Sequence, residues 1–337
     1  MEEIAIVHHP LIGPMIQYAV EKGISQKRLF ETLQLDHLQP NITDIKIKPD
    51  QFKQLIHFIR AKTGDRNFGL QVGESIRGGN LGILGFAMMN CKNFSEALDK
   101  FVHYYQLVGN ITRFSVQFVD EKVKYQWLFV NKELWDYRIP ILQGLIASIN
   151  PLVYELTNQT IDFSSAHFCW EQPDDITEYQ RIFGKKLLFG EPYTGVVFNQ
   201  RYLKYPLKSP NSELLLMFET HTREKYNAIF NKKLYTNEVI NILSGSSYSE
   251  ITVCEIAKKM SLTLRNLQLK LKSEGTTFSQ LKESIQRDLA VNHLLSGTYS
   301  IAEIGTRLGF SEPGAFYRAF KRWTGKTPRE YYKPGTK

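Results

Sequence analysis

Two stretches near the C-terminus repeat one pattern, and this repeat restricts the fold more than any other feature of the chain. The first runs from Glu255 to Leu271 and the second from Glu303 to Phe320, 48 residues further along. Each has a small residue, a turn residue and two apolar residues at i and i+4 in the same order, which is typical of a helix-turn-helix. One such pattern is a common coincidence, whereas two with matching positions predict two helix-turn-helix units.

The matching positions have defined structural roles. The small residue lies where two helices would cross, the turn residue lies between the helices, and a cap residue precedes the second helix. The apolar pair of the second helix faces the core. These positions are held by Ala257, Ser261, Thr263, Leu267 and Leu271 in the first unit, and by Gly305, Gly309, Ser311, Phe316 and Phe320 in the second, where one residue is inserted after the cap.

Apolar periodicity predicts five helices in this region. They are Val253 to Met260 and Leu264 to Ser273 in the first unit, Ser300 to Leu308 and Glu312 to Trp323 in the second, and Thr277 to Leu295 between the units. Pro313 suits a first helical turn, because its missing N–H has no intrahelical partner there. A connecting helix of about 18 residues spans roughly 27 Å. We therefore expect the two recognition helices to lie about 34 Å apart, one turn of DNA.

The recognition helix of the first unit carries side chains suited to reading bases. Arg bridges guanine O6 and N7, and Asn or Gln pairs with adenine. The candidate DNA-binding residues of this unit are Thr263, Leu264, Arg265, Asn266, Gln268, Lys270 and Lys272. For a single helix of this kind the alternative is a solvated amphipathic helix.

The recognition helix of the second unit is denser in positive charge. Most protein–DNA hydrogen bonds go to the backbone, so its Lys and Arg side chains are expected to hold phosphates, and Tyr317 a phosphate or sugar. The candidate DNA-binding residues of this unit are Ser311, Glu312, Gly314, Ala315, Tyr317, Arg318, Lys321 and Arg322.

The distribution of charge agrees with a polyanionic partner. The chain of 337 residues has a formal net charge of +8. Residues 236–337 hold 15 Lys and Arg against 9 Asp and Glu, whereas residues 1–235 hold 27 against 25. Most of the positive excess therefore lies in the segment that contains the repeat.

The remainder of the chain is long enough for a second domain. Helical periodicity dominates the first 110 residues, followed by alternating strands at Arg113 to Val119 and Val123 to Val130 with a turn at Asp120-Glu121. Further expected elements are helices from His9 to Glu21, from Pro49, from Phe68 to Val72, from Phe94 to Leu107 with Ser95 as a cap, from Pro140 to Leu156 and from Asp174 to Phe183, and strands at Ala166 to Trp170 and Gly195 to Phe198. This order indicates an α+β domain.

A break at Pro206 and Pro210 marks the domain boundary. We expect an α+β regulatory domain over residues 1–207, a helical linker over 208–235, and an all-α domain over 236–335 in which a long helix joins two helix-turn-helix units. The helix from Ser212 to Phe230 serves as a connector or as part of a dimer face. The glycine-rich stretch 77–85 has no preceding strand and no Gly-Lys-Ser/Thr ending, so it predicts close helix packing and not a phosphate loop.

Several classes of site are not supported. Cys91, Cys169 and Cys254 are far apart and are expected to be reduced thiols that pack in cores. His8, His9 and His221 have no partners at ligand spacing, so neither a metal site, a cofactor nor a catalytic centre is predicted. No apolar run approaches about 20 residues and the first residues lack a basic signal region, so we expect a cytoplasmic protein.

The stretch from Gly309 to Pro328 resembles the closing signature of the AraC/XylS family of transcription regulators. Ala257 to Leu271 and Glu274 to Phe278 resemble the family's first unit and connector, so that about 100 residues are covered. More loosely, Leu81 to Ala87 and Phe183 to Phe198 resemble the arabinose-binding-type regulatory domain of the branch that includes the ornithine-utilisation regulators. Two positions depart from the family: Leu269 stands where Arg is common, and Ser261 where Gly is favoured.

The resemblance implies a bacterial activator that binds promoter DNA with both units, contacts RNA polymerase, and is controlled by a small-molecule effector in its N-terminal domain, with a homodimer as a further expectation. Sugar is not thereby implied as the effector. Two alternatives stay open. One is a DNA-repair-type enzyme with reactive cysteines, which the scattered cysteines disfavour. The other is an architectural DNA-binding protein without an effector, which the large aromatic-rich N-terminal domain disfavours.

Overall fold

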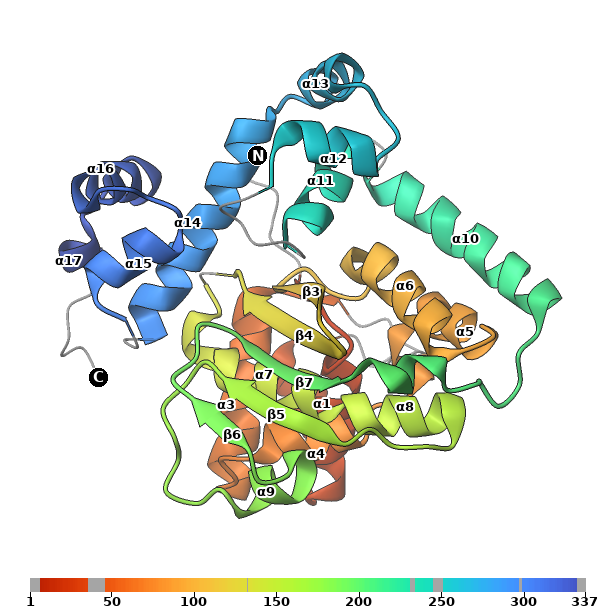
Figure 1. The fold of residues 1–337 in the computed structure, drawn as a ribbon. Helices are drawn as coiled ribbons and strands as arrows, with labels where there is room; N and C mark the ends of the chain where they lie inside the picture. Colours follow the sequence, from red (N-terminus) through yellow and green to blue (C-terminus); the bar gives the residue numbers. More distant parts are fainter. Residues whose placement is uncertain are drawn as a thin grey trace.

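The computed structural model describes residues 7–35, 46–131, 133–230, 234–244, 251–296 and 299–331. It has an α+β N-terminal part built on a five-stranded sheet and a helical C-terminal part that lies beside strands β3 and β4 of that sheet (Figure 1). The expected fold class is thus confirmed. A short pair of strands, β1 (Val7–His8) and β2 (Lys46–Ile47), lies outside the main sheet.

The main sheet begins with the hairpin that the alternating pattern predicts. β3 (Thr112–Val119) and β4 (Lys122–Phe129) pair antiparallel with Val119 opposite Lys122, so Asp120 and Glu121 form a two-residue turn. Asp120 has a φ of 52°, the left-handed conformation that such turns require. With β5 (Phe163–Phe168), β6 (Leu187–Phe189) and β7 (Thr194–Asn199), the strand order is β3-β4-β7-β5-β6. Only β5 and β6 of these are parallel.

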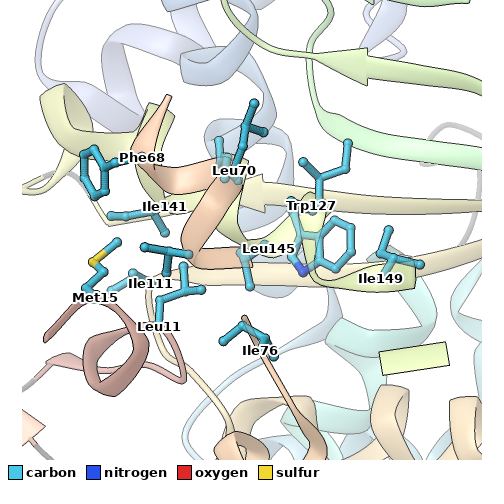
Figure 2. Close-up of a cluster of buried hydrophobic side chains, with 14 of the residues drawn as sticks. Leu11, Met15, Phe68, Leu70, Ile76, Ile111, Trp127, Ile141, Leu145 and Ile149 are labelled. Carbon is cyan, nitrogen blue, oxygen red and sulfur yellow. The ribbon is translucent and has the colours of Figure 1, made fainter. Parts of the chain in front are cut away.

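Helices cover the inner face of the sheet. They are α1 (Ile12–Glu21), α2 (Gln26–Leu33), α3 (Pro49–Thr63), α4 (Phe68–Glu74), α7 (Arg138–Ala147), α8 (Ile149–Thr157) and α9 (Thr177–Phe183). Figure 2 shows the apolar side chains where α1, α4, α7 and β4 meet, with Met15, Phe68 and Ile141 on one side of the cluster and Trp127 on the other. A Cβ on Gly69 or Gly73 would overlap backbone atoms of α7, so α4 and α7 pack closely because these positions are glycine.

The glycine-rich stretch serves helix packing, as expected. It forms a short 3₁₀ turn (Gly78–Leu81) followed by α5 (Ile83–Met89), and a Cβ on Gly85 would overlap the carbonyl of Gly78. α6 (Phe94–Tyr104) follows; its cap is Asn93, whose side chain accepts from the N–H of Glu96, so the expected cap at Ser95 is wrong. The cap lies two residues earlier than expected because the backbone of Asn93 is extended and bridges to Pro206.

The long apolar stretch expected as one helix from Pro140 to Leu156 is two helices, α7 and α8. They meet at Ser148, whose hydroxyl donates to the carbonyl of Leu145 at 2.8 Å. By length and composition Trp135–Thr157 is apolar enough to cross a membrane, but 67% of its most apolar window is buried inside the protein. This burial is what a central helix pair of a folded core shows.

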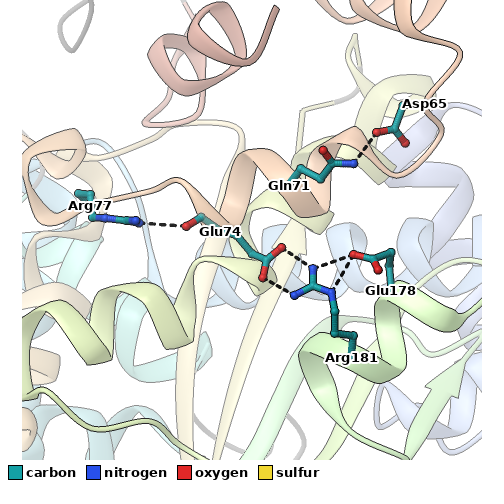
Figure 3. A network of polar contacts seen from close by, with 6 residues as sticks. All are labelled: Asp65, Gln71, Glu74, Arg77, Glu178 and Arg181. Carbon is teal, nitrogen blue, oxygen red and sulfur yellow. Dashed lines mark hydrogen bonds and ion pairs between the residues drawn. The ribbon is translucent and has the colours of Figure 1, made fainter. Parts of the chain in front are cut away.

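A polar network ties α4 to α9 at the surface. The Arg181 guanidinium donates to both carboxylate oxygens of Glu74, at 2.9 and 2.6 Å, and to Glu178 at 2.9 and 2.7 Å (Figure 3). Gln71 adds a bond to Asp65 at 2.7 Å. These carboxylates raise the pKa of Arg181 further above its usual range. Because Arg181 pairs with carboxylates of both helices, this network stabilises the packing of α4 against α9.

α10 (Ser212–Phe230), the expected linker helix, packs on the N-terminal domain. Leu215 and Tyr226 join a small core with Met88 of α5 and Tyr104 of α6. The ammonium of Lys100 on α6 pairs with Glu219 at 2.6 Å. α10 is therefore fixed along α5 and α6 before the chain enters the helical domain.

The helical domain has two small cores that share one helix. Its helices are α11 (Leu234–Ser244), α12 (Val253–Lys259), α13 (Leu264–Ser273), α14 (Phe278–Ser296), α15 (Ile301–Arg307), α16 (Pro313–Thr324) and α17 (Pro328–Tyr331). Leu281 and Ile285 of α14 pack with α11, α12 and α13, whereas Ala290 and Leu294 pack with α15 and α16.

The cysteines differ in their surroundings. Cys91 and Cys169 are buried, and burial raises the pKa of both thiols, that of Cys91 to about 12. Cys254 is exposed, so its expected core packing is wrong. It stands in the first turn of α12, whose buried face is formed by Ile256 and Ala257.

Candidate nucleic-acid interface

The supporting helices of the two units begin with the same hydrogen-bonded cap. Thr252 accepts from the N–H of Glu255 at 3.3 Å, and the Glu255 carboxylate accepts from the N–H of Thr252 at 2.7 Å. Ser300 and Glu303 repeat this at 3.3 and 2.8 Å. The backbone N–H groups hold the pKa of both glutamates below the usual range. These capping boxes were not predicted, although the Ser/Thr-x-x-Glu spacing was a usable signal.

The turns of the two units have the same pattern of backbone hydrogen bonds. In the first, Ser261 N–H donates to the carbonyl of Lys258 at 3.1 Å and Leu262 N–H to that of Ala257 at 2.8 Å. In the second, Gly309 donates to Thr306 and Phe310 to Gly305, both at 3.0 Å. Ser261 has a φ of 54° and Gly309 of 84°. Both turn residues therefore adopt the left-handed conformation, which glycine enters without strain and serine does not.

The recognition helices begin differently. Thr263 caps α13 by accepting from the N–H of Asn266 at 3.2 Å, as predicted. In the second unit the cap position belongs to Glu312, not to Ser311, and its side chain makes no capping hydrogen bond. Pro313 is the first residue of α16, and the residue before a proline is held in the extended conformation that Glu312 shows.

The small and apolar positions of the repeat form the two cores as expected. Ala257, Leu267 and Leu271 are buried in the first unit, and Gly305, Phe316 and Phe320 in the second. A Cβ on Gly305 would come within 3.1 Å of the Phe316 side chain, so the crossing needs a small residue there.

Most of the predicted DNA-binding residues lie on the surface of the helical domain. The exposed ones are Thr263, Leu264, Arg265, Asn266, Gln268 and Lys272 on or before α13, and Ser311, Glu312, Gly314, Arg318, Lys321 and Arg322 on or before α16. Ala315 and Tyr317 are half-buried. Two cations are engaged within the protein: Lys270 lies 4.2 Å over the ring of Tyr235, and Arg322 pairs with Glu283.

Aligning the two buried pairs of the recognition helices matches their exposed faces. When Leu267 is matched to Phe316 and Leu271 to Phe320, the residues that point away from the core correspond one to one. These pairs are Arg265 with Gly314, Leu269 with Arg318, and Lys272 with Lys321. Leu269 is 56% exposed. The outer face of α13 thus has a leucine at its centre where the outer face of α16 has an arginine.

The recognition helices lie at opposite ends of α14. Figure 1 shows α13 beyond the first end of α14 and α16 beside its second half, both away from the five-stranded sheet. α14 has 19 residues and so spans roughly 28 Å. The expected separation of one DNA turn stays a prediction that this length supports.

The helical domain also touches the sheet. Asp288 of α14 pairs with Arg113 of β3 at 3.2 Å, and the amide of Asn292 donates to the carbonyl of Phe129 of β4 at 3.1 Å. Asn292 is buried and Asp288 is nearly so. In the described part of the chain, no three His, Cys, Asp or Glu side chains gather in a way that could hold a metal ion.

Comparisons with known proteins match both parts of the chain. Residues 23–207, more than half of it, match the arabinose-binding domain of AraC transcription regulator, N-terminal, and residues 256–333 match a helix-turn-helix domain. The ornithine utilization regulator of Pseudomonas aeruginosa is 23% identical over 320 residues, covering 94% of this chain and 93% of that protein. The Msm operon regulatory protein of Streptococcus mutans is 36% identical over 103 residues, 30% of this chain and 37% of that protein. Among solved structures, the transcriptional regulator CdpR from Pseudomonas aeruginosa gives a TM-score of 0.46 at 18% identity, over 94% of this chain and 96% of that one.

Proposed function

Because this chain belongs to the AraC family of transcription regulators, we propose that it binds promoter DNA with both of its helix-turn-helix units at once. The observation that carries the proposal is the pairing of two equivalent units on one helix, each with its recognition helix exposed. Two half-sites in successive major grooves are the expected target. The N-terminal domain, of the arabinose-binding type, would bind a small-molecule effector that controls this binding.

The two recognition helices would have different roles in DNA binding. Arg318 and Lys321 share the outer face of α16 and would hold phosphates. Arg265 and Gln268 of α13 carry planar groups that can form paired hydrogen bonds with base edges. The second unit would therefore supply affinity for any DNA, and the first would supply more of the sequence preference.

The phosphate role is tested by the double variant Arg318→Ala with Lys321→Ala. Each lost phosphate contact should reduce the slope of log affinity against log salt by about 0.9, so the slope should fall by nearly two. The matched control is Arg60→Ala with Lys62→Ala, which removes two exposed cations from α3 of the N-terminal domain. A slope equal to that of the control would rule out phosphate contact by both residues.

The base-reading role is tested by selecting binding sites from random DNA with Arg265→Ala and Gln268→Ala. Each variant should lose preference at particular base pairs, worth about 1–3 kcal/mol per pair. A uniform loss across all sequences would instead make these residues phosphate contacts.

The repair-enzyme alternative is disfavoured by the two buried cysteines. A thiolate nucleophile needs a lowered pKa, whereas burial raises the pKa of Cys91 and Cys169.

We further propose that the protein acts in the cytoplasm as a homodimer and contacts RNA polymerase when it activates. Genome-wide DNA occupancy, measured with and without a metabolite extract, would identify the sites, their spacing and the dependence on an effector. Occupancy that no extract changes would favour the effector-independent alternative.

A further inference from the structure

An apolar cavity lies between the inner face of the β3–β4 hairpin and helices α6 and α8. Its volume is about 50 Å³. The aromatic side chains at its wall include Phe101, Phe114 and Trp127, and Leu152 closes the opposite side. Figure 2 shows Trp127 beside Ile149, another wall residue.

Two wall residues, Tyr125 and Trp127, carry a buried polar group with no hydrogen-bond partner in the described part of the chain. The indole N–H of Trp127 acts on the Tyr105 hydroxyl, so the Tyr125 hydroxyl is the group left for a ligand. Tyr125 is 4% exposed. The other hydroxyl of the wall, that of Ser148, already donates to Leu145. An unpaired buried hydroxyl costs about 1–3 kcal/mol, so a ligand that accepts from Tyr125 would recover part of that cost.

The lining also limits the charge of a ligand. The residues of the wall carry no charged side chain, and the negative charge of Asp99 acts on Tyr125 from outside the wall. An anion in the cavity would lose its hydration and be repelled by Asp99. A cation would also lose its hydration, and the wall has no carboxylate that could pair with it. Burial raises the pKa of Tyr125 well above its usual value, which keeps the hydroxyl protonated as a donor. A compact, neutral, mainly apolar molecule with one acceptor fits these conditions.

The outer face of the same hairpin carries the contact with the DNA-binding domain. Side chains alternate along a strand, so Phe114 points into the cavity while its neighbour Arg113 points outward to Asp288 at 3.2 Å. On β4, Trp127 lines the cavity and the carbonyl of Phe129, two residues along, accepts from Asn292. Movement of Phe114 or Trp127 would thus shift the two strands that hold α14.

We propose that this cavity binds a compact neutral apolar effector with a single hydrogen-bond acceptor, and that its occupancy loosens the contact between the hairpin and α14. The proposal rests on the proposed function of the N-terminal domain as an effector-binding domain. Because the open space is small, a ligand must widen it by displacing the hairpin's inner side chains. Binding of the ligand and separation of α14 therefore favour each other.

The binding site is tested by fluorine NMR on the full chain with three matched probes. These are 4-fluoroacetophenone, which has an acceptor; 1-ethyl-4-fluorobenzene, which lacks one; and 4-fluorobenzoate, which is anionic. The ketone should bind about fivefold more tightly than the hydrocarbon, from one neutral hydrogen bond, and the benzoate should not bind. Absence of binding by both neutral probes, or a preference for the benzoate, would overturn the proposal.

Two variants locate the site. Tyr125→Phe should abolish the difference between the ketone and the hydrocarbon while the hydrocarbon still binds, which also shows that the variant folds. Val153→Phe, from the wall, should weaken both neutral probes at least about tenfold by filling the space. Tyr154→Phe, 52% exposed on the same helix, is the control and should change neither. Equal probe affinities in Val153→Phe and the wild type would place the binding elsewhere and overturn the assignment.

The coupling is tested by Asp288→Asn, which removes the charge that pairs with Arg113 of the sheet and with the adjacent Arg287. If ligand binding and separation of α14 favour each other, this variant should bind the ketone about fivefold more tightly or better. Glu283→Gln on the same helix, which pairs with Arg322 and not with the sheet, is the control. An unchanged or lower affinity in Asp288→Asn would overturn the coupling. None of these measurements involves DNA, so a negative result would not affect the DNA-binding proposal. That proposal is tested separately by the salt dependence of DNA affinity in the Arg318→Ala, Lys321→Ala variant.

Discussion

Leu269 and Ser261 are two residues at which the first unit differs from the second. Leu269 occupies the centre of the outer face of α13, at the position of Arg318 in α16. Ser261 adopts a left-handed conformation that Gly309 adopts without strain. Since the two units share the order of their helices and the positions of their buried residues, each difference can be tested by exchanging residues between the units.

Leu269→Arg should increase binding to all DNA. A second arginine on the outer face adds a phosphate contact, so the slope of log affinity against log salt should become steeper by about 0.9. Arg318→Leu should reduce it by the same amount. Fluorescence anisotropy across a salt series measures both. Should Leu269→Arg instead lose affinity at one base pair only, Leu269 would be an apolar contact to a thymine methyl group.

Ser261→Gly should stabilise the helical domain. A non-glycine residue in the left-handed region costs about 1–2 kcal/mol, and the greater freedom of glycine in the unfolded chain returns part of this. We expect a gain of about 0.5–1 kcal/mol in the free energy of unfolding, and a loss of similar size for the reciprocal change Gly309→Ser. Denaturant unfolding measures both; a loss of stability in Ser261→Gly would mean that the serine side chain makes a compensating contact.

Residue roles that depend on local spacing could be predicted from the sequence, and those that depend on tertiary contacts could not. The cap at Thr263 and the buried Leu267 and Phe316 followed from periodicity alone. The interaction of Lys270 with Tyr235 and of Arg322 with Glu283 brings together residues 35 or more positions apart, so no local pattern reveals it. Whether the exposed candidates contact DNA stays a prediction.

At the scale of elements, α14 is the helix on which the two units depend. Its first half completes one core and its second half the other. His293 lies in the second half, buried near Tyr299, whose ring is 4.0 Å from the Arg307 guanidinium. Burial, and then the charge of Arg307, lower the pKa of His293 to about 4. The helix therefore holds a histidine that the fold keeps neutral.

The stability of the protein should fall as the pH drops from about 6.5 to 4. In this window the unfolded chain protonates His293 whereas the folded protein does not, so protons favour unfolding; above pH 6.5 the contribution is fully retained. The expected loss is up to about 3 kcal/mol. Denaturant unfolding at several pH values should show a shallower pH dependence for His293→Phe than for the wild type. Parallel curves would show that His293 titrates normally in the folded state.

Periodic elements such as the helices of the DNA-binding domain and the β3–β4 hairpin were predictable, and the shortest strands were not. The five helices of the DNA-binding domain from α12 to α16 agree with the periodicity to within one or two residues at each end. β6, with three residues, and β1 and β2, with two each, were missed because such segments have no period of their own. The break between α7 and α8 was missed because apolar residues continue through Ser148.

At the scale of the whole molecule, α10 exposes apolar side chains that a monomer leaves in water. Leu214, Leu216 and Met217 are 40%, 67% and 56% exposed. Phe86 of α5, which stacks on Phe218, is 45% exposed beside them. A contiguous apolar surface of this kind is typical of a protein–protein interface. Because α10 also leads into the DNA-binding domain, pairing of two chains there would place four helix-turn-helix units together.

Leu216→Glu combined with Met217→Glu should convert a dimer to a monomer, because association would bury two new unpaired charges. Sedimentation velocity at micromolar concentration measures the change. The control is His221→Glu, an exposed polar position on the same helix, which should leave the mass unchanged. A double variant that sediments as the wild type does would place any dimer contact on another surface.

The length of the shared helix α14 also sets the spacing and the relative rotation of the two recognition helices. Each residue of an α-helix adds 1.5 Å and turns the chain by about 100°. One residue inserted between Ile285 and Ala290 would therefore rotate the second recognition helix by about a quarter-turn relative to the first, while Ile285 and Ala290 stay in their separate cores. The phase and spacing of the two half-sites in an operator would thus be set by the length of this helix, and a new spacing could arise from a single codon without any change in a DNA-contacting residue.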